Sequence, residues 1–265
     1  MSKPFLSVII PAYNEAKRLP ITLIDVDRHL SNQDFEYEII VSMSPSSDHG
    51  ADIVKRLSGV MKKIKLLELP INLGKGAAVR AGMKVAKGSW RVYMDADNST
   101  SIVEFNKMLP YLALPRARRA DSLEHGAYEV AIGSRYLIGA SLNPAPPISR
   151  ALGARLVNLY ARLFCVTGVS DVLCGFKVFS ETASEAIFGK SRANGWMFDV
   201  EVIVLARRFG YHIKEVPIFW TSAAASRHSV SHTLSSFGEL LRITGWLFFD
   251  AYHLTKKRVK SSAHA

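Results

Sequence analysis

The chain has 265 residues, 48% of them hydrophobic and 22% charged, which is long and apolar enough for a full core and excludes disorder on a large scale. Its 34 lysines and arginines outnumber 23 acidic residues and give a net charge of +11, which favours an anionic partner: nucleic acid, a phosphorylated substrate or an acidic membrane surface. The two cysteines, Cys165 and Cys174, lack zinc-like spacing, so a zinc site is excluded and reduced thiols are expected.

Strands and helices alternate through the first hundred residues. Strands are expected over residues 6–11, 37–43, 64–69 and 90–94, and helices over about 20–30, 51–60 and 77–86. Four strand–helix steps indicate an α/β fold with a mostly parallel, doubly wound sheet. Ligands of such sheets bind beyond the carboxyl ends of the strands. We therefore expect a site formed by the loops at 11–15, 43–48, 72–76 and 95–97.

Asp95 and Asp97 follow the expected strand 90–94. Because strand side chains alternate between faces, the two carboxylates are expected to point the same way and to hold one hard cation. A cation with two protein ligands keeps open positions for a diphosphate. A solvated turn after a buried strand is the alternative reading of so short a motif.

The loop 72–76 opens the next helix and contains Lys75 between two glycines. Its backbone N–H groups, the helix N-terminus and the Lys75 ammonium would suit phosphate, although the same glycines also serve an ordinary tight turn. The full P-loop pattern is absent, since Ala77 and Ala78 follow Gly76.

Six motifs, in one order, extend from about residue 5 to about residue 220. They are SVIIPAYNE at 7–15, NLGKGAAVRAG at 72–82, MDAD at 94–97, GSRY at 133–136, DVLCGFK at 171–177 and FDVE at 198–201. Together they resemble the family 2 glycosyltransferases of GT-A fold, and in particular the dolichyl (polyprenyl) phosphate glucosyl- and mannosyltransferases. The set is far more specific than any single motif.

The resemblance implies an inverting transfer of a hexose from a nucleotide-diphosphate sugar to a polyprenyl phosphate, with Mg²⁺ or Mn²⁺ as cofactor. The residues implied to bind the nucleotide sugar are Pro11, Tyr13, Glu15, Lys75, Arg80, Asp95 and Asp97. Asp95 and Asp97 would hold the metal, which stabilises the charge of the departing diphosphate. Glucose is favoured over mannose, because Ser99 stands where some mannosyltransferases carry Gln.

On the acceptor side, the resemblance implies that Arg135 and Arg150 receive the acceptor phosphate, which guanidinium groups can orient bidentately. Asp171 would either act directly in the site or form a buried ion pair that supports the fold. A second hypothesis uses a hydroxyl acceptor, which requires a carboxylate base, with Asp171 or Asp199 as the candidate.

One segment departs from the family pattern. Where the family usually shows Val-Asp-Asp-Gly-Ser, this chain reads Ser-Met-Ser-Pro-Ser at 42–46, so Met43 and Ser44 replace an acidic pair. Asp48 follows a few residues later. A third hypothesis is therefore a catalytically weakened nucleotide-sugar binding protein. Nucleic-acid binding is disfavoured, because the basic residues are dispersed and no recognition motif accompanies them.

Two later segments carry apolar stripes. The stripe Leu152, Leu156, Leu159 and Leu163 recurs at helical spacing, and a core-facing helix with basic flanks is favoured over a lipid-contact surface. We expect a glycosyltransferase domain over 1–225 and a C-terminal loop and amphipathic basic helix over 226–265. That helix is apolar on both sides, so it needs cover from the domain, from a partner subunit in a homo-oligomer, or from lipid.

The N-terminal residues lack the regions of a signal peptide, so a cytosolic start is expected. The most apolar stretch, 243–254, is shorter than the roughly 18 residues that a spanning helix needs. The sequence therefore predicts a cytoplasmic protein that does not cross a bilayer and lies peripherally at the cytoplasmic face of a membrane, with the basic run 256–260 beside its C-terminal helix.

Overall fold

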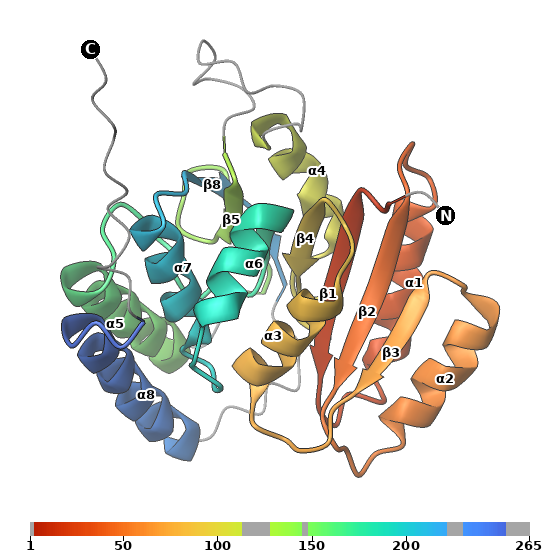
Figure 1. Ribbon diagram of the computed structural model, residues 1–265, viewed down its shortest axis with the longest axis horizontal. Coiled ribbons are helices and arrows are strands. Elements are labelled where there is room, and N and C mark those ends of the chain that lie inside the picture. The colour runs from red at the N-terminus through yellow and green to blue at the C-terminus, as the bar shows by residue number, and fades with distance from the viewer. Residues whose placement is uncertain (1–2, 113–127, 145–147, 222–229, 253–265) are drawn as a thin grey trace, which may run out of the picture.

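The computed structural model describes residues 3–112, 128–144, 148–221 and 230–252, and for residues 148–151 and 230–235 it describes the backbone alone. A seven-stranded sheet crosses this part of the chain, with helices on both faces (Figure 1). Along the sheet the strands are β3 (Ile64–Glu68), β2 (Tyr37–Met43), β1 (Leu6–Ala12), β4 (Trp90–Tyr93), β7 (Lys177–Ser180), β5 (Val130–Ser134) and β8 (Ile213–Pro217).

The sheet is mostly parallel, which confirms the predicted class. Strand β1 runs parallel to β2 and β4, β2 to β3, and β5 to β8, whereas β7 is antiparallel to both of its neighbours. In the register of β1 and β2 Ala12 lies beside Met43, so these two strands end level with each other. The loops after these strands therefore meet at one edge of the sheet.

Each face of the sheet has its own hydrophobic core. One face is covered by α1 (Leu19–Leu30), α2 (Gly50–Val60), α4 (Phe105–Met108) and the 3₁₀ turns η1 (Ile102–Glu104) and η2 (Leu109–Tyr111). The other is covered by α3 (Lys75–Val85), α6 (Glu181–Lys190) and α7 (Phe198–Arg208). Because strand side chains alternate, Val8 of β1 packs in the first core and Ile9 in the second.

Two further helices, α5 (Ile148–Phe164) and α8 (Val230–Phe248), lie side by side next to α7 (Figure 1). The hydroxyl oxygens of Tyr160 and Thr244 are 3.2 Å apart, and the rings of Tyr160 and Phe237 have centroids 6.0 Å apart. A small second sheet pairs β6 (Ser141–Leu142) with β9 (Phe219–Trp220).

The predicted core-facing stripe of α5 is wrong. Leu156 and Leu163 are 59% and 67% exposed, whereas Asn158 and Ala161 on the opposite side of the helix are buried. Helical periodicity places the leucines on one face but does not say which face packs inward.

The predicted boundary at residue 225 lies in the segment 222–229, outside the described residues, so the division into 1–225 and 226–265 stays a prediction. Among the helices that the structure describes, none combines the length and the apolar character required to span a bilayer.

Candidate active site

The acidic pair lies in the loop that follows β4. That strand ends at Tyr93, so Asp95 and Asp97 do not owe their positions to strand alternation, and this part of the prediction is wrong. Their carboxylates nevertheless act on the same two cations. Both raise the pKa of Lys75, and both contribute to the raised pKa of Arg18. The main cause of the raised pKa of Arg18 is its hydrogen bond to Glu15. The two carboxylates therefore share one region of the site.

Lys75 is the nearest cation to this pair. Its ammonium lies 2.5 Å from Asp95 Oδ1 and 5.1 Å from the centroid of the Trp196 ring, and its side chain is 11% exposed. Burial by itself would lower the pKa of Lys75, but the neighbouring carboxylates, Asp95 foremost, outweigh burial and raise it. Lys75 is thus a permanent positive charge at the sheet edge.

The donor set at this edge fits a hard divalent cation such as Mg²⁺ or Mn²⁺. The Asp95 and Asp97 side chains are 35% and 23% exposed, so they keep oxygens that solvent or a ligand can reach. A Cβ at Gly175 would collide with the Asp95 carboxylate, so a side chain there would displace this carboxylate. Across the described ranges no group of three or more His, Cys, Asp or Glu forms a closed metal site. Two carboxylates suit an open site that substrate oxygens complete.

The loop before α3 differs from the prediction. The helix begins at Lys75, and the N–H groups of Gly76 and Ala77 donate to the carbonyls of Gly195 and Asn194, each at 3.2 Å. These backbone donors are therefore not free for phosphate. Gly74 has φ of 111°, and a Cβ there would collide with the Asn194 carbonyl, so this turn requires glycine.

Arg80 also serves this contact. Its guanidinium donates to the Ala193 carbonyl at 3.1 Å and to the Asn194 side chain, while the Glu201 carboxylate accepts the N–H groups of Arg192 and Ala193. Arg80 therefore fixes the loop 192–195 on α3. Its implied place near the nucleotide stays a proposal, and its visible contacts are structural.

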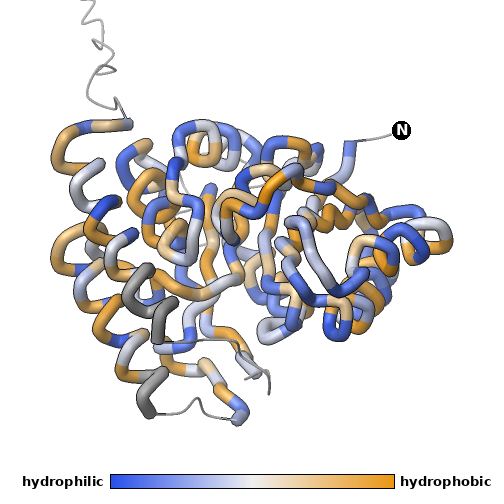
Figure 2. Tube along the Cα trace, turned by 90° about the horizontal axis from the view of Figure 1, so that it is seen from below, coloured by the Kyte–Doolittle hydropathy of each residue, from blue (hydrophilic) through white to orange (hydrophobic). Residues whose placement is uncertain are grey.

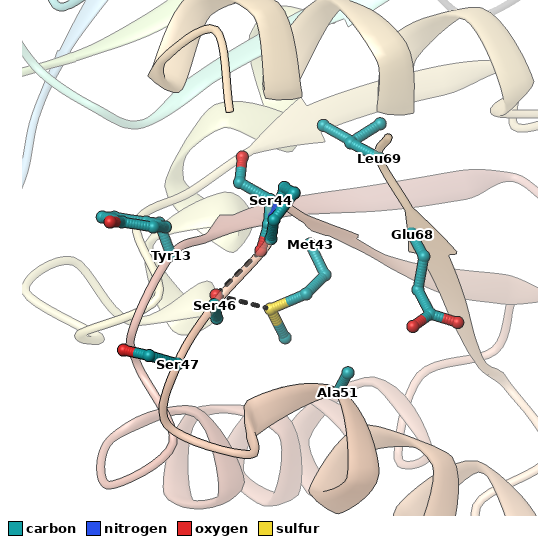
Figure 3. Close-up of a pocket in the computed structure, with 9 residues that line it drawn as sticks. Tyr13, Met43, Ser44, Ser46, Ser47, Ala51, Glu68 and Leu69 are labelled. Carbon is teal, nitrogen blue, oxygen red and sulfur yellow. Dashed lines mark hydrogen bonds between the residues drawn. The ribbon is translucent and has the colours of Figure 1, made fainter. Parts of the chain in front are cut away.

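A cavity of about 530 Å³ opens where β1, β2 and β3 end (Figure 3). It is lined by Tyr13, Met43, Ser44, Pro45, Ser46, Ser47, Ala51, Glu68 and Leu69. Tyr13 and Glu68 stand on opposite sides, with Met43 between them. Tyr13 is 49% exposed, which leaves its ring free to stack on a nucleobase.

The other two residues implied on this side do not line the cavity. Pro11 lies within β1, and the Glu15 carboxylate is bound by Arg18, with Nε 2.6 Å from Oε2. Of the three implied neighbours of the nucleotide, Tyr13 alone is among the lining residues.

No carboxylate takes the place of the missing acidic pair on the cavity floor. Ser44 is 3% exposed and lines the cavity. The Asp48 carboxylate accepts the N–H groups of Ala16 at 2.7 Å and Gly50 at 3.1 Å, so it holds two loops together. Among the lining residues the acidic one is Glu68, which pairs with Lys55 at the surface.

Arg135 and Asp171 form a bidentate ion pair. Arg135 Nε and Nη2 lie 2.7 and 2.8 Å from the two Asp171 oxygens, and the Arg135 backbone N–H also reaches Oδ2. Asp171 is fully buried, and its pull outweighs burial and raises the pKa of Arg135. The geometry gives Asp171 the task of orienting Arg135. Arg150 lies in the first turn of α5, and its side chain is outside the described residues.

Asp199 is enclosed in a second buried cluster. Its Oδ1 accepts from the Tyr93 hydroxyl at 2.5 Å and from the ammonium of Lys177, which is 0% exposed and also donates to the carbonyl of Cys174. Both carboxylates considered as a base for a hydroxyl acceptor, Asp171 and Asp199, are thus buried in ion pairs. Neither is placed to take a proton from a substrate.

Sequence reasoning missed Arg18 and Glu239. Arg18 Nη1 lies 3.7 Å from Asp97 Oδ2. Arg18 follows Glu15 by three residues and pairs with it, and this short spacing is a local signal that could have pointed to Arg18. Glu239 of α8 accepts the N–H groups of Gly195 at 2.7 Å and Met197 at 3.0 Å. Its partners are more than 40 residues away, and no motif marks it.

The structure resembles solved glycosyltransferases. A crystal structure of glucosyl-3-phosphoglycerate synthase from Mycobacterium tuberculosis, in complex with Mn²⁺, uridine diphosphate and glucosyl-3-phosphoglycerate, gives a TM-score of 0.64 at 19% identity. The match covers 91% of this chain and 80% of that one. The fold is therefore of the GT-A type, as predicted.

Sequence comparison gives a narrower result. The chain is 32% identical to a dolichyl-phosphate beta-glucosyltransferase of Trichomonas vaginalis, over 94% of this chain and 73% of the relative. The corresponding enzyme of Dictyostelium discoideum is also 32% identical, over 84% of this chain and 68% of the relative. The profile named Glycosyl transferase family 2 matches residues 7–188. The chain belongs to glycosyl transferase family 2.

Proposed function

We propose that the protein is an inverting, metal-dependent glucosyltransferase that moves glucose from a nucleotide-diphosphate sugar to a polyprenyl (dolichyl) phosphate. Its relatives are named for glucose transfer to dolichyl phosphate, and its structural neighbour binds Mn²⁺ and uridine diphosphate. We further propose that it acts peripherally at the cytoplasmic face of a membrane, where the lipid acceptor is presented.

The main support for this proposal is the position of the short segment from Asp171 to Gly175. At one end Asp171 holds the Arg135 guanidinium, and at the other Gly175 lies against the Asp95 carboxylate. Four residue steps extend over at most about 14 Å. A cationic group suited to an acceptor phosphate therefore stands within reach of the carboxylates suited to a donor diphosphate.

The proposed reaction is a single displacement at the anomeric carbon. An oxygen of the lipid phosphate forms the new bond to this carbon, while the bond to the diphosphate oxygen breaks and its electrons leave with the nucleoside diphosphate. A monophosphate with its second pKa near 6 is already anionic at neutral pH, so no general base is required. A divalent cation, when bound by Asp95 and Asp97, would stabilise the charge of the leaving group. Lys75 adds a fixed positive charge beside them.

The test is a donor screen with Mn²⁺. Uridine- and guanosine-diphosphate sugars are incubated with the protein, with and without a short-chain polyprenyl phosphate, and the β-linked lipid sugar is measured. We expect transfer from uridine-diphosphate glucose that requires the lipid phosphate and is lost in Asp97→Asn. Donor hydrolysis that is indifferent to the lipid would contradict the proposal, and binding without turnover would favour the weakened binding protein.

A further inference from the structure

Two neighbouring helices expose a continuous apolar surface. We call it the α5–α8 face and define it by Leu156, Leu159 and Leu163 of α5 and Phe237, Leu241 and Phe248 of α8. These side chains are between 49% and 84% exposed. Figure 2 shows hydrophobic stretches recurring along these helices at the left of the molecule. Exposed apolar patches of this kind mark interaction surfaces in soluble proteins.

The two halves of this face are in contact. The ring of Tyr160 lies between them, with its centroid 4.8 Å from that of Phe164 and 6.0 Å from that of Phe237. On the inner side, Leu240 and Ile243 of α8 are fully buried in the second core. Both helices are thus anchored by one side and present an apolar side outward.

Arginines border the face. Helical spacing places Arg155 and Arg162 along the edge of α5 that is turned away from α8, and Arg242 beyond Leu241 on the outer edge of α8. Arg207 and Arg208 of α7 join Arg162 around a hollow of about 450 Å³ at the end of α5. An apolar strip with a cationic border is the composition of a surface that lies in the interface of an anionic bilayer.

A second copy of the chain is a weaker occupant. Pairing two copies through this face would bring the same arginines of both copies together, in a protein whose net charge is +11. An anionic lipid surface instead complements that charge. The 17 residues of α5 give a length of about 25 Å, so both helices can lie in the membrane plane with their apolar sides inserted.

The face also borders the proposed acceptor site. Tyr136, next to Arg135, lies close enough to α5 for the Asn158 side chain and the Arg155 charge to counter part of the effect of burial, which raises the pKa of the Tyr136 hydroxyl. The Arg135 guanidinium lies 5.9 Å from the centroid of the Tyr136 ring. A phosphate at the level of the lipid headgroups would therefore meet Arg135 along the edge of α5.

We propose that the α5–α8 face lies on an anionic lipid bilayer and orients Arg135 toward lipid-borne phosphate. Only the second half of this inference, the orientation of Arg135 toward lipid-borne phosphate, rests on the proposed function, because it assumes that the acceptor is a lipid phosphate.

The test is sedimentation with vesicles of phosphatidylcholine alone and of phosphatidylcholine with phosphatidylserine. We expect binding to the anionic vesicles that weakens with salt. The variant Leu156→Glu/Leu163→Glu should bind at least about a hundredfold more weakly, since each exposed leucine contributes about tenfold to partitioning. The matched control is Ile21→Glu/Ile24→Glu on α1, where the side chains are 69% and 42% exposed, and it should bind as the wild type does. Arg155→Glu/Arg162→Glu should remove the preference for anionic vesicles.

Wild-type binding by the leucine variant, or absence of binding by the wild-type protein, would overturn the inference. So would a wild-type dimer, measured by sedimentation velocity without vesicles, that the leucine variant abolishes. Failure of the proposed function gives a different result. If only the proposed function is wrong, the protein still binds anionic vesicles but does not transfer glucose to a short-chain polyprenyl phosphate in detergent. If only the docking inference is wrong, that transfer takes place and the leucine variant keeps it.

Discussion

The Lys75 ammonium lies 2.5 Å from the Asp95 carboxylate, at the sheet edge where the donor diphosphate is proposed to bind. In this arrangement Lys75 is the counter-ion of the Asp95 carboxylate. A divalent cation that binds there must therefore share this carboxylate with Lys75. The same positive charge would attract a diphosphate. We therefore expect Lys75 to oppose binding of the metal alone and to favour binding of the nucleotide.

We expect Lys75→Met to separate these two effects. Titration calorimetry should show Mn²⁺ alone binding more tightly, by a factor of several, and uridine diphosphate in the presence of Mn²⁺ binding at least about tenfold more weakly, the effect of losing one charged contact. Lys84→Met, at an exposed position of the same helix, is the control and should change neither constant. Weaker binding of Mn²⁺ alone by Lys75→Met would contradict this account.

The ion pair between Arg135 and Asp171 gives a second prediction. If Asp171 orients Arg135, Asp171→Asn should raise the KM for polyprenyl phosphate about tenfold or more, because the guanidinium loses its charged anchor, and should leave the donor affinity unchanged. Steady-state kinetics with varied acceptor measure this. The control is Asp34→Asn, an exposed position. A loss of kcat with unchanged KM would instead indicate a direct chemical role.

Contacts between distant parts of the chain explain which elements could be predicted from sequence. The strands of the first hundred residues and the Asp95–Asp97 motif are local patterns, and the structure has them within a few residues of their expected positions. The hydrogen bonds of Arg80 to the loop 192–195 and of Glu239 to Gly195 join segments far apart, and no local pattern encodes them. Whether the leucine stripe of α5 faces the core or the solvent depends on how α5 packs against α7 and α8. The periodicity of the sequence alone does not give this information.

Ser44 allows a test of donor recognition. It lines the cavity at the position where the family pattern has an acidic residue, and a carboxylate there could accept the N–H groups of a nucleobase. We expect Ser44→Asp to bind uridine diphosphate about tenfold more tightly in titration calorimetry, in line with one charge-assisted hydrogen bond. Ser47→Asp, which adds the same charge at the exposed rim, should not. An equal gain in affinity for uridine diphosphate from both variants would show that the added charge acts without a specific contact to the nucleobase.

Glu38 gives a prediction for pH. This carboxylate is 2% exposed and accepts hydrogen bonds from Lys65, Ser7 and the Lys87 backbone N–H. Burial alone would raise the pKa of Glu38, but these bonds outweigh it and lower the pKa below its ordinary value of 4.5. The resulting stabilisation is present above pH 4.5 and disappears as the pH falls through the lowered pKa.

Glu38→Gln should therefore lower the free energy of unfolding by about 1.5–3 kcal/mol at pH 7, the range for hydrogen bonds to charged groups. The difference from the wild type should narrow when urea unfolding is repeated below pH 4.5, where the wild-type carboxylate becomes protonated. A difference that stays constant over this range would show that the charge of Glu38 is not its source.

Glu239 connects α8 to the loop that lies against Gly76 and Lys75. From α8 it holds the N–H groups of Gly195 and Met197, and the carbonyl of Gly195 in turn accepts the N–H of Gly76 next to Lys75. Glu239→Gln keeps the shape of the side chain but loses the charge, so the position of the loop against α3 should loosen. We expect weaker binding of uridine diphosphate with Mn²⁺, by about tenfold.

The same variant should still bind anionic vesicles, because Glu239 is not part of the α5–α8 face. If docking acts on the donor site through this contact, anionic vesicles will increase the turnover of a short-chain acceptor by the wild-type protein and not by Glu239→Gln. The control Glu36→Gln, at a side chain 58% exposed, should respond as the wild type does. Equal stimulation of all three proteins would show that docking does not act on the donor site through the contact between Glu239 and Gly195.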